Sequence, residues 1–243
     1  MLRMFFPWKT LRRWYDTHLA GMASMSNKAF DLVIFDMDGT LLDSMVCLAD
    51  WLHRAVKDNC PSPVTPAIIT SAFGPTEEQI IEKFVSRDLV QPSLNVYYDL
   101  YEREHDRIFV YPGIDKLLEA VRNQGIPIAL CTGKSRRAVE ISLDRLGWRS
   151  HFQAIITGDD TTRFKPDPEG LNLILAQIPV ARKRTIFIGD SPADTEAANK
   201  AGIISGQAEW GTSENMLPMN AQPDYRFAMS HEAINLFVAQ PHK

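Results

Sequence analysis

The chain has 243 residues, of which 45% are hydrophobic and 23% are charged, and its formal net charge is −4. These proportions are typical of a globular protein, and the length suits one α/β domain that carries an insertion. The net charge gives no indication of nucleic-acid binding, and no apolar run is long enough to span a membrane. Three widely spaced cysteines do not make a disulfide framework and fit a reducing compartment. We therefore expect a cytoplasmic protein without nucleic-acid or membrane partners.

Residues 1–28 form an unusual start to the chain. They are basic and aromatic, and Asp16 is the single acidic residue among them. Pro7 and the short, broken apolar runs match the core of a signal peptide poorly. We expect an N-terminal extension outside the folded domain, with a peripheral surface helix or a targeting peptide as the alternatives.

The first predicted element is a strand, because residues 31–36 read DLVIFD, an apolar run with β-branched members. A helix is expected over residues 44–60, where apolar residues recur at helical spacing. From residue 61 to about residue 110 the sequence indicates only helices and turns. This helical interval separates the first strand from all later strands. We interpret residues 45–109 as an inserted helical cap.

Strands and helices alternate in the remainder of the chain. The expected strands cover residues 126–132, 152–160, 184–190 and 224–229. The expected helices cover residues 114–124, 134–147, 167–177, 191–202 and 231–240. Continuous apolar strands that alternate with helices are typical of a parallel sheet covered on both faces. The sequence therefore predicts an α/β protein whose Rossmann-like core, residues 29–44 and 110–243, carries the inserted cap.

Polar residues follow the ends of several predicted strands. They are Asp36 and Asp38 after the first strand, Thr132 and Gly133 after the next, and Asp190 after a third, with Asp194 one helical turn later. Lys165 lies just before a predicted helix. The carboxyl ends of parallel strands meet at one edge of a sheet, where ligands bind. We therefore expect these side chains to form one site.

The expected site carries an excess of negative charge, because as many as four carboxylates would share it with Lys165. Two like charges about 4 Å apart repel by about 4 kcal/mol at an effective dielectric constant of 20. One lysine cannot balance that cluster, whereas a divalent cation can. Oxygen ligands without histidine favour Mg²⁺, which usually keeps several waters and is completed by a substrate phosphate. The sequence therefore predicts a Mg²⁺ site that handles a phosphate ester.

The spacing of Asp36 and Asp38 suits phosphoryl transfer. Alternate residues of extended backbone point the same way, so both carboxylates can reach one phosphorus atom. One of them can attack as a nucleophile while the other exchanges a proton with the leaving oxygen. The Thr132 hydroxyl and the Gly133 N–H can donate hydrogen bonds to the phosphoryl oxygens.

Four motifs carry a family resemblance. They are DMDGTLLDS at residues 36–44, CTG at 131–133, FKPDP at 164–168 and GDSPAD at 189–194. In this order they resemble the four motifs of the haloacid dehalogenase-like (HAD) superfamily. More narrowly, they resemble its phosphoglycolate-phosphatase-like branch, which has a small helical cap. The resemblance extends from about residue 30 to the C-terminus and implies the capped α/β fold.

The resemblance implies a role for each aspartate. Asp36 would be the nucleophile that forms an aspartyl-phosphate, and Asp38 would be the general acid and then the base that activates water. Asp190 would bind Mg²⁺ together with the Asp36 carboxylate and the Asp38 carbonyl oxygen, and Asp194 would support the metal site. Dehalogenases and phosphonatases of the superfamily lack the second aspartate, so Asp38 favours phosphate-ester chemistry.

The resemblance also implies which residues bind the phosphoryl group. Thr132 and the backbone of Gly133 would hold it, and Lys165 would screen its charge and that of Asp36. Relatives commonly carry Asn or Ser at the position of Gly133. Residues 73–78 are either the cap loop that faces substrate in relatives or a plain turn between helices. The candidates for binding a substrate carboxylate in the cap are Arg87, Arg103 and Arg107.

The expected function is a Mg²⁺-dependent phosphatase that acts on a small phosphorylated metabolite, and the resemblance makes phosphoglycolate the leading substrate. An intramolecular phosphotransferase of the β-phosphoglucomutase kind would use the same motifs and remains an alternative. A non-catalytic binding protein on the same scaffold is a third hypothesis, but it predicts missing motif residues and none is missing. The sequence leaves the physiological substrate and the oligomeric state open.

Overall fold

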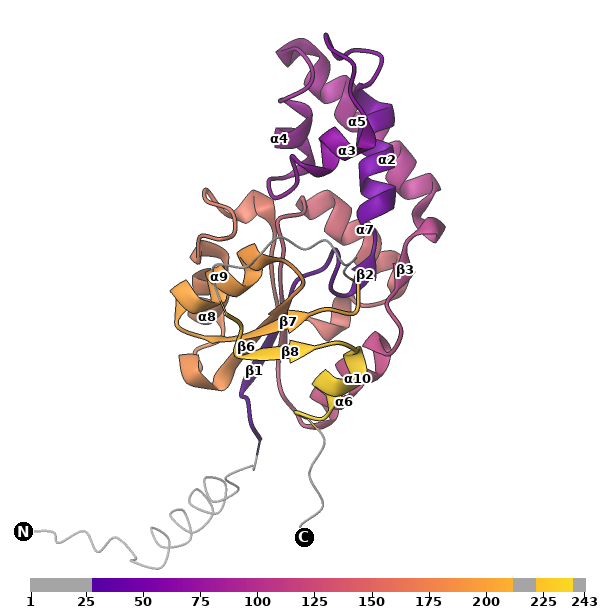
Figure 1. Cartoon of the computed structure of the whole chain (residues 1–243). Helices are drawn as coiled ribbons and strands as arrows, with labels where there is room; N and C mark the ends of the chain where they lie inside the picture. Colours follow the sequence, from indigo (N-terminus) through magenta and orange to yellow (C-terminus); the bar gives the residue numbers. More distant parts are fainter. Residues whose placement is uncertain (1–27, 212–221, 238–243) are drawn as a thin grey trace, which may run out of the picture.

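The computed structural model describes residues 28–211 and 222–237. It confirms the predicted α/β fold, since a sheet flanked by helices forms one body and a group of helices projects from it (Figure 1). The extension expected at residues 1–28 lies outside the described residues except for Lys28. The last predicted helix, 231–240, is described only as far as residue 237.

The core sheet has six parallel strands in the order β5-β4-β1-β6-β7-β8. Their bounds are β1 Leu32–Phe35, β4 Ile128–Cys131, β5 Ala154–Ile156, β6 Thr185–Gly189, β7 Ile204–Ala208 and β8 Tyr225–Phe227. This is the Rossmann-like order, and the direction of strand progression reverses on either side of β1. A ligand is therefore expected at the carboxyl end of β1, the strand that leads into the two aspartates.

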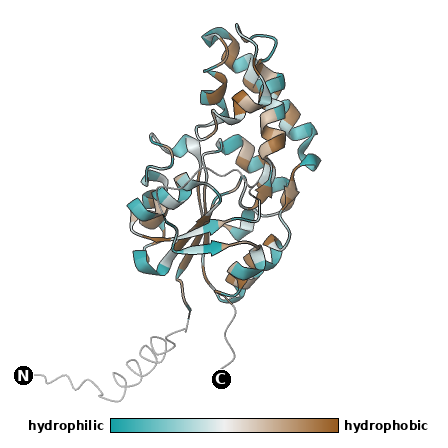
Figure 2. Ribbon diagram, in the orientation of Figure 1, coloured by the Kyte–Doolittle hydropathy of each residue, from teal (hydrophilic) through white to brown (hydrophobic). Residues whose placement is uncertain are grey.

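Helices cover both faces of the sheet, as the alternation predicted. One face is covered by α6 (Ile114–Asn123), α7 (Arg136–Leu146) and α10 (Ser230–Ile234), and the other by α8 (Glu169–Gln177) and α9 (Pro192–Ala201). Alternate residues of a strand point to opposite faces of the sheet. Val33 and Phe35 of β1 therefore belong to the apolar cluster under α6, α7 and α10, and Leu32 and Ile34 belong to the cluster under α8 and α9. Apolar residues accordingly concentrate in the sheet and on the inward sides of the helices (Figure 2).

Four helices fall in the interval expected to form the cap. They are α2 (Met45–Val56), α3 (Pro66–Thr70), α4 (Glu77–Ile81) and α5 (Arg87–Arg103). Trp51 on α2 packs edge to face on Tyr101 of α5 with ring centroids 5.2 Å apart, and Tyr97 lies 5.8 Å from Tyr101. All three rings are fully buried, in an apolar cluster that continues from the cap into the core. None of the described helices is long and apolar enough to cross a membrane.

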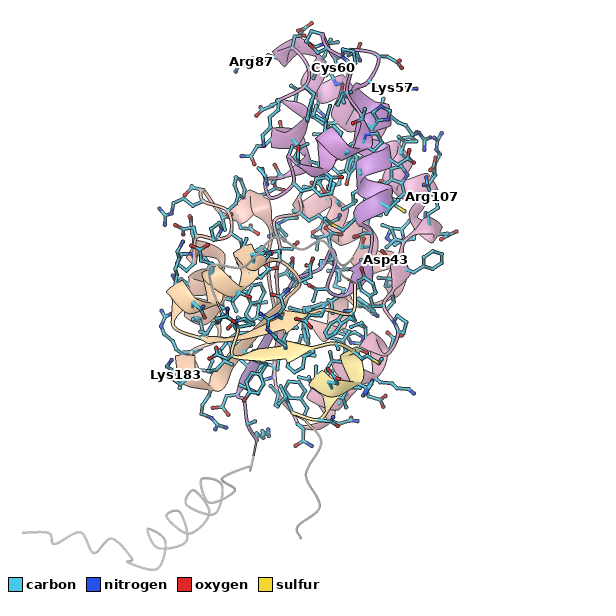
Figure 3. All side chains as sticks on the ribbon, in the orientation of Figure 1. Asp43, Lys57, Cys60, Arg87, Arg107 and Lys183 are labelled. Atoms are coloured by element: carbon cyan, nitrogen blue, oxygen red, sulfur yellow. The ribbon has the colours of Figure 1, made fainter. Side chains whose placement is uncertain are left out.

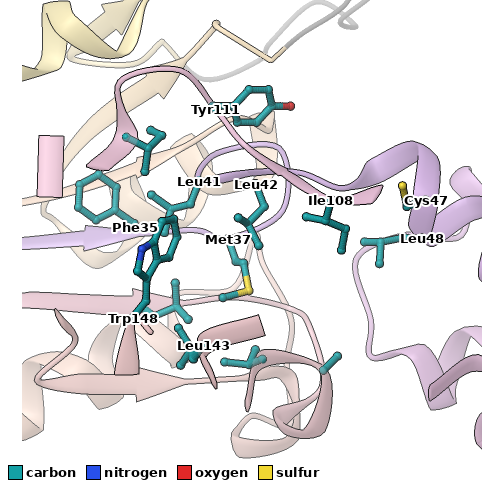
Figure 4. Close-up of a cluster of buried hydrophobic side chains, with 14 of the residues drawn as sticks. Phe35, Met37, Leu41, Leu42, Cys47, Leu48, Ile108, Tyr111, Leu143 and Trp148 are labelled. Carbon is teal, nitrogen blue, oxygen red and sulfur yellow. The ribbon is translucent and has the colours of Figure 1, made fainter. Parts of the chain in front are cut away.

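A two-stranded ribbon that the sequence did not predict joins the cap to the core. Strands β2 (Leu42–Asp43) and β3 (Phe109–Val110) pair antiparallel where the chain enters and leaves the cap. Buried apolar side chains run along this junction from Phe35 in the core to Leu48 in the cap (Figure 4). Two residues per strand are too few to give a period-two pattern, which explains the missed prediction. Short 3₁₀ turns complete the structure at His105–Arg107, Arg149–His151, Gly158–Asp160 and Arg182–Arg184.

Strand β7 is the other strand that the sequence did not predict. Its sequence, ISGQA, carries polar residues that are unusual for an interior strand. Both polar side chains are buried and have partners: the Ser205 hydroxyl donates to Asp224 at 3.0 Å, and the Gln207 carbonyl accepts from Thr195 at 3.0 Å. Hydrogen bonds to residues elsewhere in the fold therefore allow these polar side chains to be buried in a strand. The pattern of apolar residues along the sequence does not reveal such bonds.

Candidate active site

The carboxyl end of β1 brings Asp36 to the edge of the sheet. Asp36 is 7% exposed, and its Oδ1 accepts a hydrogen bond from the Met37 N–H at 2.8 Å. The chain then turns back, because the Gly39 N–H donates to the Leu42 carbonyl at 2.8 Å. Gly39 has a φ of +80°, in the left-handed region that favours glycine. The turn therefore leaves Asp36 and Asp38 together in the lining of the same pocket.

Lys165 reaches Asp36 from the loop before α8. Its Nζ lies 2.9 Å from Asp36 Oδ2 and 2.6 Å from Asp194 Oδ1. Burial by itself lowers the pKa of a lysine, but these two carboxylates outweigh it and hold the pKa of Lys165 above its ordinary value of 10.5. Lys165 therefore stays protonated and offsets part of the negative charge around Asp36.

Three carboxylates form a group that could hold a metal ion. One oxygen from each of Asp36, Asp190 and Asp194 lies within 4.8 Å of the other two. The Thr40 hydroxyl donates to Asp190 at 3.1 Å, and a Cβ at Gly39 would collide with the Asp190 carboxylate. The glycine of the turn therefore has a second use, since it allows Asp190 to lie against the backbone that follows Asp36.

The residues present fit a divalent cation. Burial raises the pKa of Asp36 from its ordinary value of 3.8 to about 6, although Lys165 opposes the shift. Burial also raises the pKa of Asp190, and the neighbouring carboxylates of Asp194 and Asp36 add to it. Both shifts reflect negative charge that one lysine does not balance. Carboxylate oxygens around such an excess are the donors that Mg²⁺ prefers.

Asp194 differs from the other two carboxylates because it forms part of a helix cap. Its Oδ2 accepts hydrogen bonds from the Ser191 hydroxyl at 2.6 Å and the Ser191 N–H at 2.9 Å. Ser191 and Asp194 thereby form a capping box at the start of helix α9. Its Oδ1 forms the ion pair with Lys165. This arrangement favours a supporting position for Asp194 over direct binding of an ion.

The end of strand β4 supplies Thr132 and Gly133. The Thr132 N–H donates to the Ile156 carbonyl at 3.0 Å, and its hydroxyl oxygen accepts from the Lys134 N–H at 3.3 Å. Thr132 and Gly133 line a cavity of about 270 Å³ between the core and the cap. Every core residue predicted for catalysis, phosphate binding or metal binding lines this cavity except Asp194, which is buried.

Lys134 is a site residue that the sequence interpretation missed. Its side chain is 1% exposed, and its Nζ lies 3.0 Å from Asp38 Oδ2, 3.8 Å from Glu77 Oε1 and 4.8 Å from the centre of the Tyr101 ring. Burial lowers the pKa of Lys134, but the Asp38 and Glu77 carboxylates outweigh it, so the pKa lies above its ordinary value of 10.5. Its position directly after Gly133, at a strand end, was the signal that could have identified it.

Asp38 is held from two sides. The Ser44 hydroxyl donates to Asp38 Oδ1 at 2.6 Å, while Lys134 forms the ion pair with Oδ2. Ser44 immediately precedes α2, the first helix of the cap. Asp38 and Asp36 therefore have different cationic partners, Lys134 and Lys165, although they are one residue apart.

Glu77, at the start of α4, connects the cap to the loop after β4. Its Oε2 accepts a hydrogen bond from the Ser135 N–H at 2.9 Å, and the Tyr97 hydroxyl donates to its Oε1 at 3.1 Å. The Tyr98 hydroxyl donates to the Ser135 hydroxyl at 2.9 Å. These contacts dock residues 73–78 onto the core at the edge of the cavity. The structure therefore favours a pocket-facing loop here over a plain turn between helices.

Replacing Gly133 with alanine is expected to loosen this docked loop and leave the sheet folded. The φ of Gly133 is not positive, so its backbone accepts alanine, but the new Cβ would collide with the Gly74 carbonyl of the cap. Overpacking of this kind costs about 1–3 kcal/mol, so amide exchange in residues 73–80 should accelerate roughly 5- to 150-fold. Hydrogen-exchange mass spectrometry measures this, with the sheet strands as the internal control. Unchanged exchange in the cap loop would show that the close contact contributes nothing to docking.

Known proteins with similar sequences are phosphatases by name. Residues 33–207 match the family model described as Haloacid dehalogenase-like hydrolase. A phosphoglycolate phosphatase from Pseudomonas putida is 32% identical over 181 residues, covering 71% of this chain and 66% of that protein, slightly under two thirds of its length. A phosphoglycolate phosphatase from Vibrio cholerae is 29% identical over 209 residues, covering 82% of this chain and 92% of that protein.

A solved structure with the same architecture extends this similarity. The crystal structure of a predicted phosphoglycolate phosphatase from Haemophilus somnus superposes with a TM-score of 0.75 at 25% sequence identity, covering 87% of this chain and 99% of that one. The family match spans well over half of the chain and includes all four motifs from the end of β1 to the start of α9. The chain therefore belongs to the haloacid dehalogenase-like hydrolase family.

Proposed function

We propose that the protein is a Mg²⁺-dependent phosphatase that releases phosphate from a small phosphorylated metabolite through an aspartyl-phosphate on Asp36. One observation carries the proposal: two carboxylates in one pocket have separate cationic partners, Asp36 with Lys165 and Asp38 with Lys134. Transfer to a carboxylate needs a nucleophile and a separate proton donor, and this arrangement provides both. The similarity to named phosphoglycolate phosphatases supports a phosphatase activity and makes phosphoglycolate the reference substrate against which others are compared.

The metal ion would bind beside the nucleophile. The carboxylates of Asp36 and Asp190, with the carbonyl oxygen of Asp38, would hold Mg²⁺, and Asp194 would keep Lys165 in place beside them. Mg²⁺ bound there supplies positive charge to the phosphoryl oxygens. Lys165 supplies further positive charge at the Asp36 carboxylate itself.

The reaction would proceed in two displacements at phosphorus: transfer of the phosphoryl group to Asp36, and then its hydrolysis by water. A carboxylate oxygen of Asp36 attacks phosphorus, the P–O bond to the leaving group breaks, and Asp38 gives its proton to the departing oxygen. Asp38, now ionised, then takes a proton from a water molecule whose oxygen attacks the same phosphorus. Phosphate leaves, the Asp36 carboxylate is regenerated and Asp38 is protonated again. The Thr132 hydroxyl and the Gly133 N–H would donate to the phosphoryl oxygens in both steps.

We also propose that the two bodies act as core and cap. Residues 29–44 and 110–243 would form the catalytic core, and residues 45–109 the cap. The β2–β3 ribbon, where the chain enters and leaves the cap, is the natural hinge. An open cap would admit substrate, and a docked cap would exclude bulk water during transfer.

A reducing environment fits the three cysteines. Cys47, Cys60 and Cys131 are all unpaired, and burial raises the pKa of the Cys131 thiol to about 12. These features support the expected cytoplasmic location, which we retain as a proposal.

The decisive test is phosphate release from a panel of phosphorylated metabolites, with Mg²⁺ and with a chelator. We expect hydrolysis that depends on Mg²⁺. Conversion of a sugar 1-phosphate into its isomer without net phosphate release would instead identify an intramolecular phosphotransferase. Failure to hydrolyse any ester in the panel would contradict the proposal.

Mg²⁺ is expected to raise the melting temperature, and more strongly at about pH 7.5 than at about pH 5. Burial raises the pKa of Asp36 to about 6, so the metal-free folded state binds a proton more tightly than the unfolded chain. Its stability should therefore fall as pH rises from about 4 to about 6, and Mg²⁺, which competes with that proton, should restore stability above this range. At a hundred times the dissociation constant the gain is about 2.7 kcal/mol, or roughly 5–10 °C. Scanning calorimetry checks this, and equal shifts at both pH values would contradict it.

A further inference from the structure

The cap side of the cavity is mostly apolar. The cap residues whose hydrocarbon side chains line it are Met45, Leu48, Leu52, Phe73 and Ile80. They belong to the cap, whereas the residues proposed to bind the phosphoryl group belong to the core, so the leaving group of a bound ester would lie toward them. Apolar surface of this kind stabilises a bound hydrocarbon group and offers no hydrogen bond to a carboxylate.

The cations of the cavity are already paired with carboxylates of the protein. Among the described residues that line it, the basic ones are Lys134 and Lys165. Lys165 lies 2.9 Å from Asp36, on the phosphoryl side. Lys134, on the cap side, lies 3.0 Å from Asp38 and 3.8 Å from Glu77. Neither lysine is therefore left over for a negatively charged leaving group.

The arginines that the sequence suggested for a substrate carboxylate lie elsewhere. None of Arg87, Arg103 and Arg107 lines the cavity. Figure 3 shows Arg87 at the end of the cap farthest from the sheet and Arg107 on the outer side of the cap junction. Arg107 also forms ion pairs with Asp50 at 2.9 Å and with Glu104 at 2.6 Å. The structure therefore gives no support to the suggestion that these arginines bind a carboxylate in the cavity.

Glu77 makes the cap side of the cavity unfavourable for an anion. Glu77 is 5% exposed and lines the cavity, and Tyr97, which also lines it, donates its hydroxyl hydrogen bond to Glu77. On this side Lys134 is the shared ion-pair partner of two carboxylates, those of Asp38 and Glu77. A carboxylate brought next to Glu77 in a water-poor cavity would be repelled without a compensating cation.

We propose that the physiological substrate is a phosphate monoester of an uncharged, largely apolar alcohol, and that the cap discriminates against a leaving group that carries a carboxylate. This inference rests on the proposed phosphatase function and specifies its substrate class. The apolar cap residues that line the cavity bind the leaving group, and the Glu77 carboxylate repels leaving groups that carry a negative charge. Phosphoglycolate, whose leaving group carries a carboxylate, is then a poor substrate of this chain.

Three esters of similar size separate charge from polarity. The leaving group of phosphoglycolate carries a carboxylate, and that of its carboxamide analogue is neutral but polar. Isobutyl phosphate replaces the carboxylate with an isopropyl group, in which two methyl groups stand in place of the two oxygens. We expect kcat/KM to be about tenfold higher for the amide than for phosphoglycolate, and highest for isobutyl phosphate. Across unbranched alkyl phosphates, each methylene that contacts the apolar cap residues should raise kcat/KM about fourfold until the cavity is full.

The variant Glu77→Gln tests the source of the discrimination. It should raise the ratio of kcat/KM for phosphoglycolate to that for its amide about tenfold, because it removes the repelling charge. Loss of cap docking would affect both esters alike and leave the ratio unchanged. Glu78→Gln is the matched control, since Glu78 is the exposed neighbour on the same helix and does not line the cavity. Its ratio should equal that of the unmodified protein.

The outcomes distinguish this inference from the proposed function. Phosphoglycolate hydrolysed as well as, or better than, isobutyl phosphate would overturn the substrate class while leaving the phosphatase intact. A ratio unchanged in Glu77→Gln would overturn the role of Glu77. Failure to hydrolyse any ester, p-nitrophenyl phosphate included, would overturn the phosphatase proposal itself and this inference with it.

Discussion

Replacing Asp36 with asparagine is expected to lower kcat on the order of 10⁵-fold, the size of effect seen when an enzyme loses its nucleophile. The amide has nearly the shape of the carboxylate, so the buried position should still be filled. It lacks the charge and the nucleophilicity that attack on phosphorus requires. Phosphate release from any hydrolysable ester, measured at saturating Mg²⁺, checks the prediction.

Asp31→Asn provides the matched control for that experiment. Asp31 directly precedes β1 at its other end, is only half-buried and pairs with Arg184 at 2.5 Å. The same substitution there should leave kcat unchanged and alter stability by no more than about 1 kcal/mol. If Asp36→Asn kept activity close to that of Asp31→Asn, Asp36 could not be the nucleophile.

Asp38→Asn is expected to lower kcat for alkyl phosphates roughly 10³-fold and to affect p-nitrophenyl phosphate much less. An alkoxide leaves slowly unless a general acid protonates it, and such an acid typically contributes 10²- to 10⁴-fold. The nitrophenolate ion is a weak base that leaves without a proton. Steady-state rates on the two esters, compared before and after substitution, measure the difference.

The contacts of Asp38 define the competing explanation. Asp38 accepts from Ser44 and pairs with Lys134, so its loss could instead displace these neighbours and distort the site. Distortion would lower the rates on both esters equally. Ser44→Ala keeps the acid but removes one of its contacts, and should affect both esters by a similar, smaller factor.

Much of the fold and site could be predicted because both follow from the parallel sheet. Asp36 and Lys165 are far apart in the sequence, yet their side chains meet at 2.9 Å. The rule that strand ends share one edge, with the apolar runs that mark β1 and β6, predicted the position of Asp36, whereas the place of Lys165 beside it came from the family resemblance of its motif. The same rule placed Asp190 beside them without any knowledge of the cap.

The missed features depend on contacts that no local pattern encodes. Lys134 becomes part of the site only when Asp38 and Glu77 lie on either side of it, and Glu77 belongs to a helix of five residues in the cap. The location of Glu77 beside Lys134 depends on how the cap docks onto the core, and the spacing of apolar residues does not specify that docking. Strand β7 was missed for a related reason, since its polar residues are satisfied by distant partners such as Asp224.

The collision that any side chain at Gly133 would make with Gly74 has an evolutionary consequence. The loop that we propose to contact the phosphoryl group and the surface against which the cap docks share this residue. Relatives with Asn or Ser at the corresponding position must hold their cap loop farther away or in another conformation. The two positions should therefore vary together among homologues, and a graft of this cap onto a relative's core should fail unless the glycine is transferred with it.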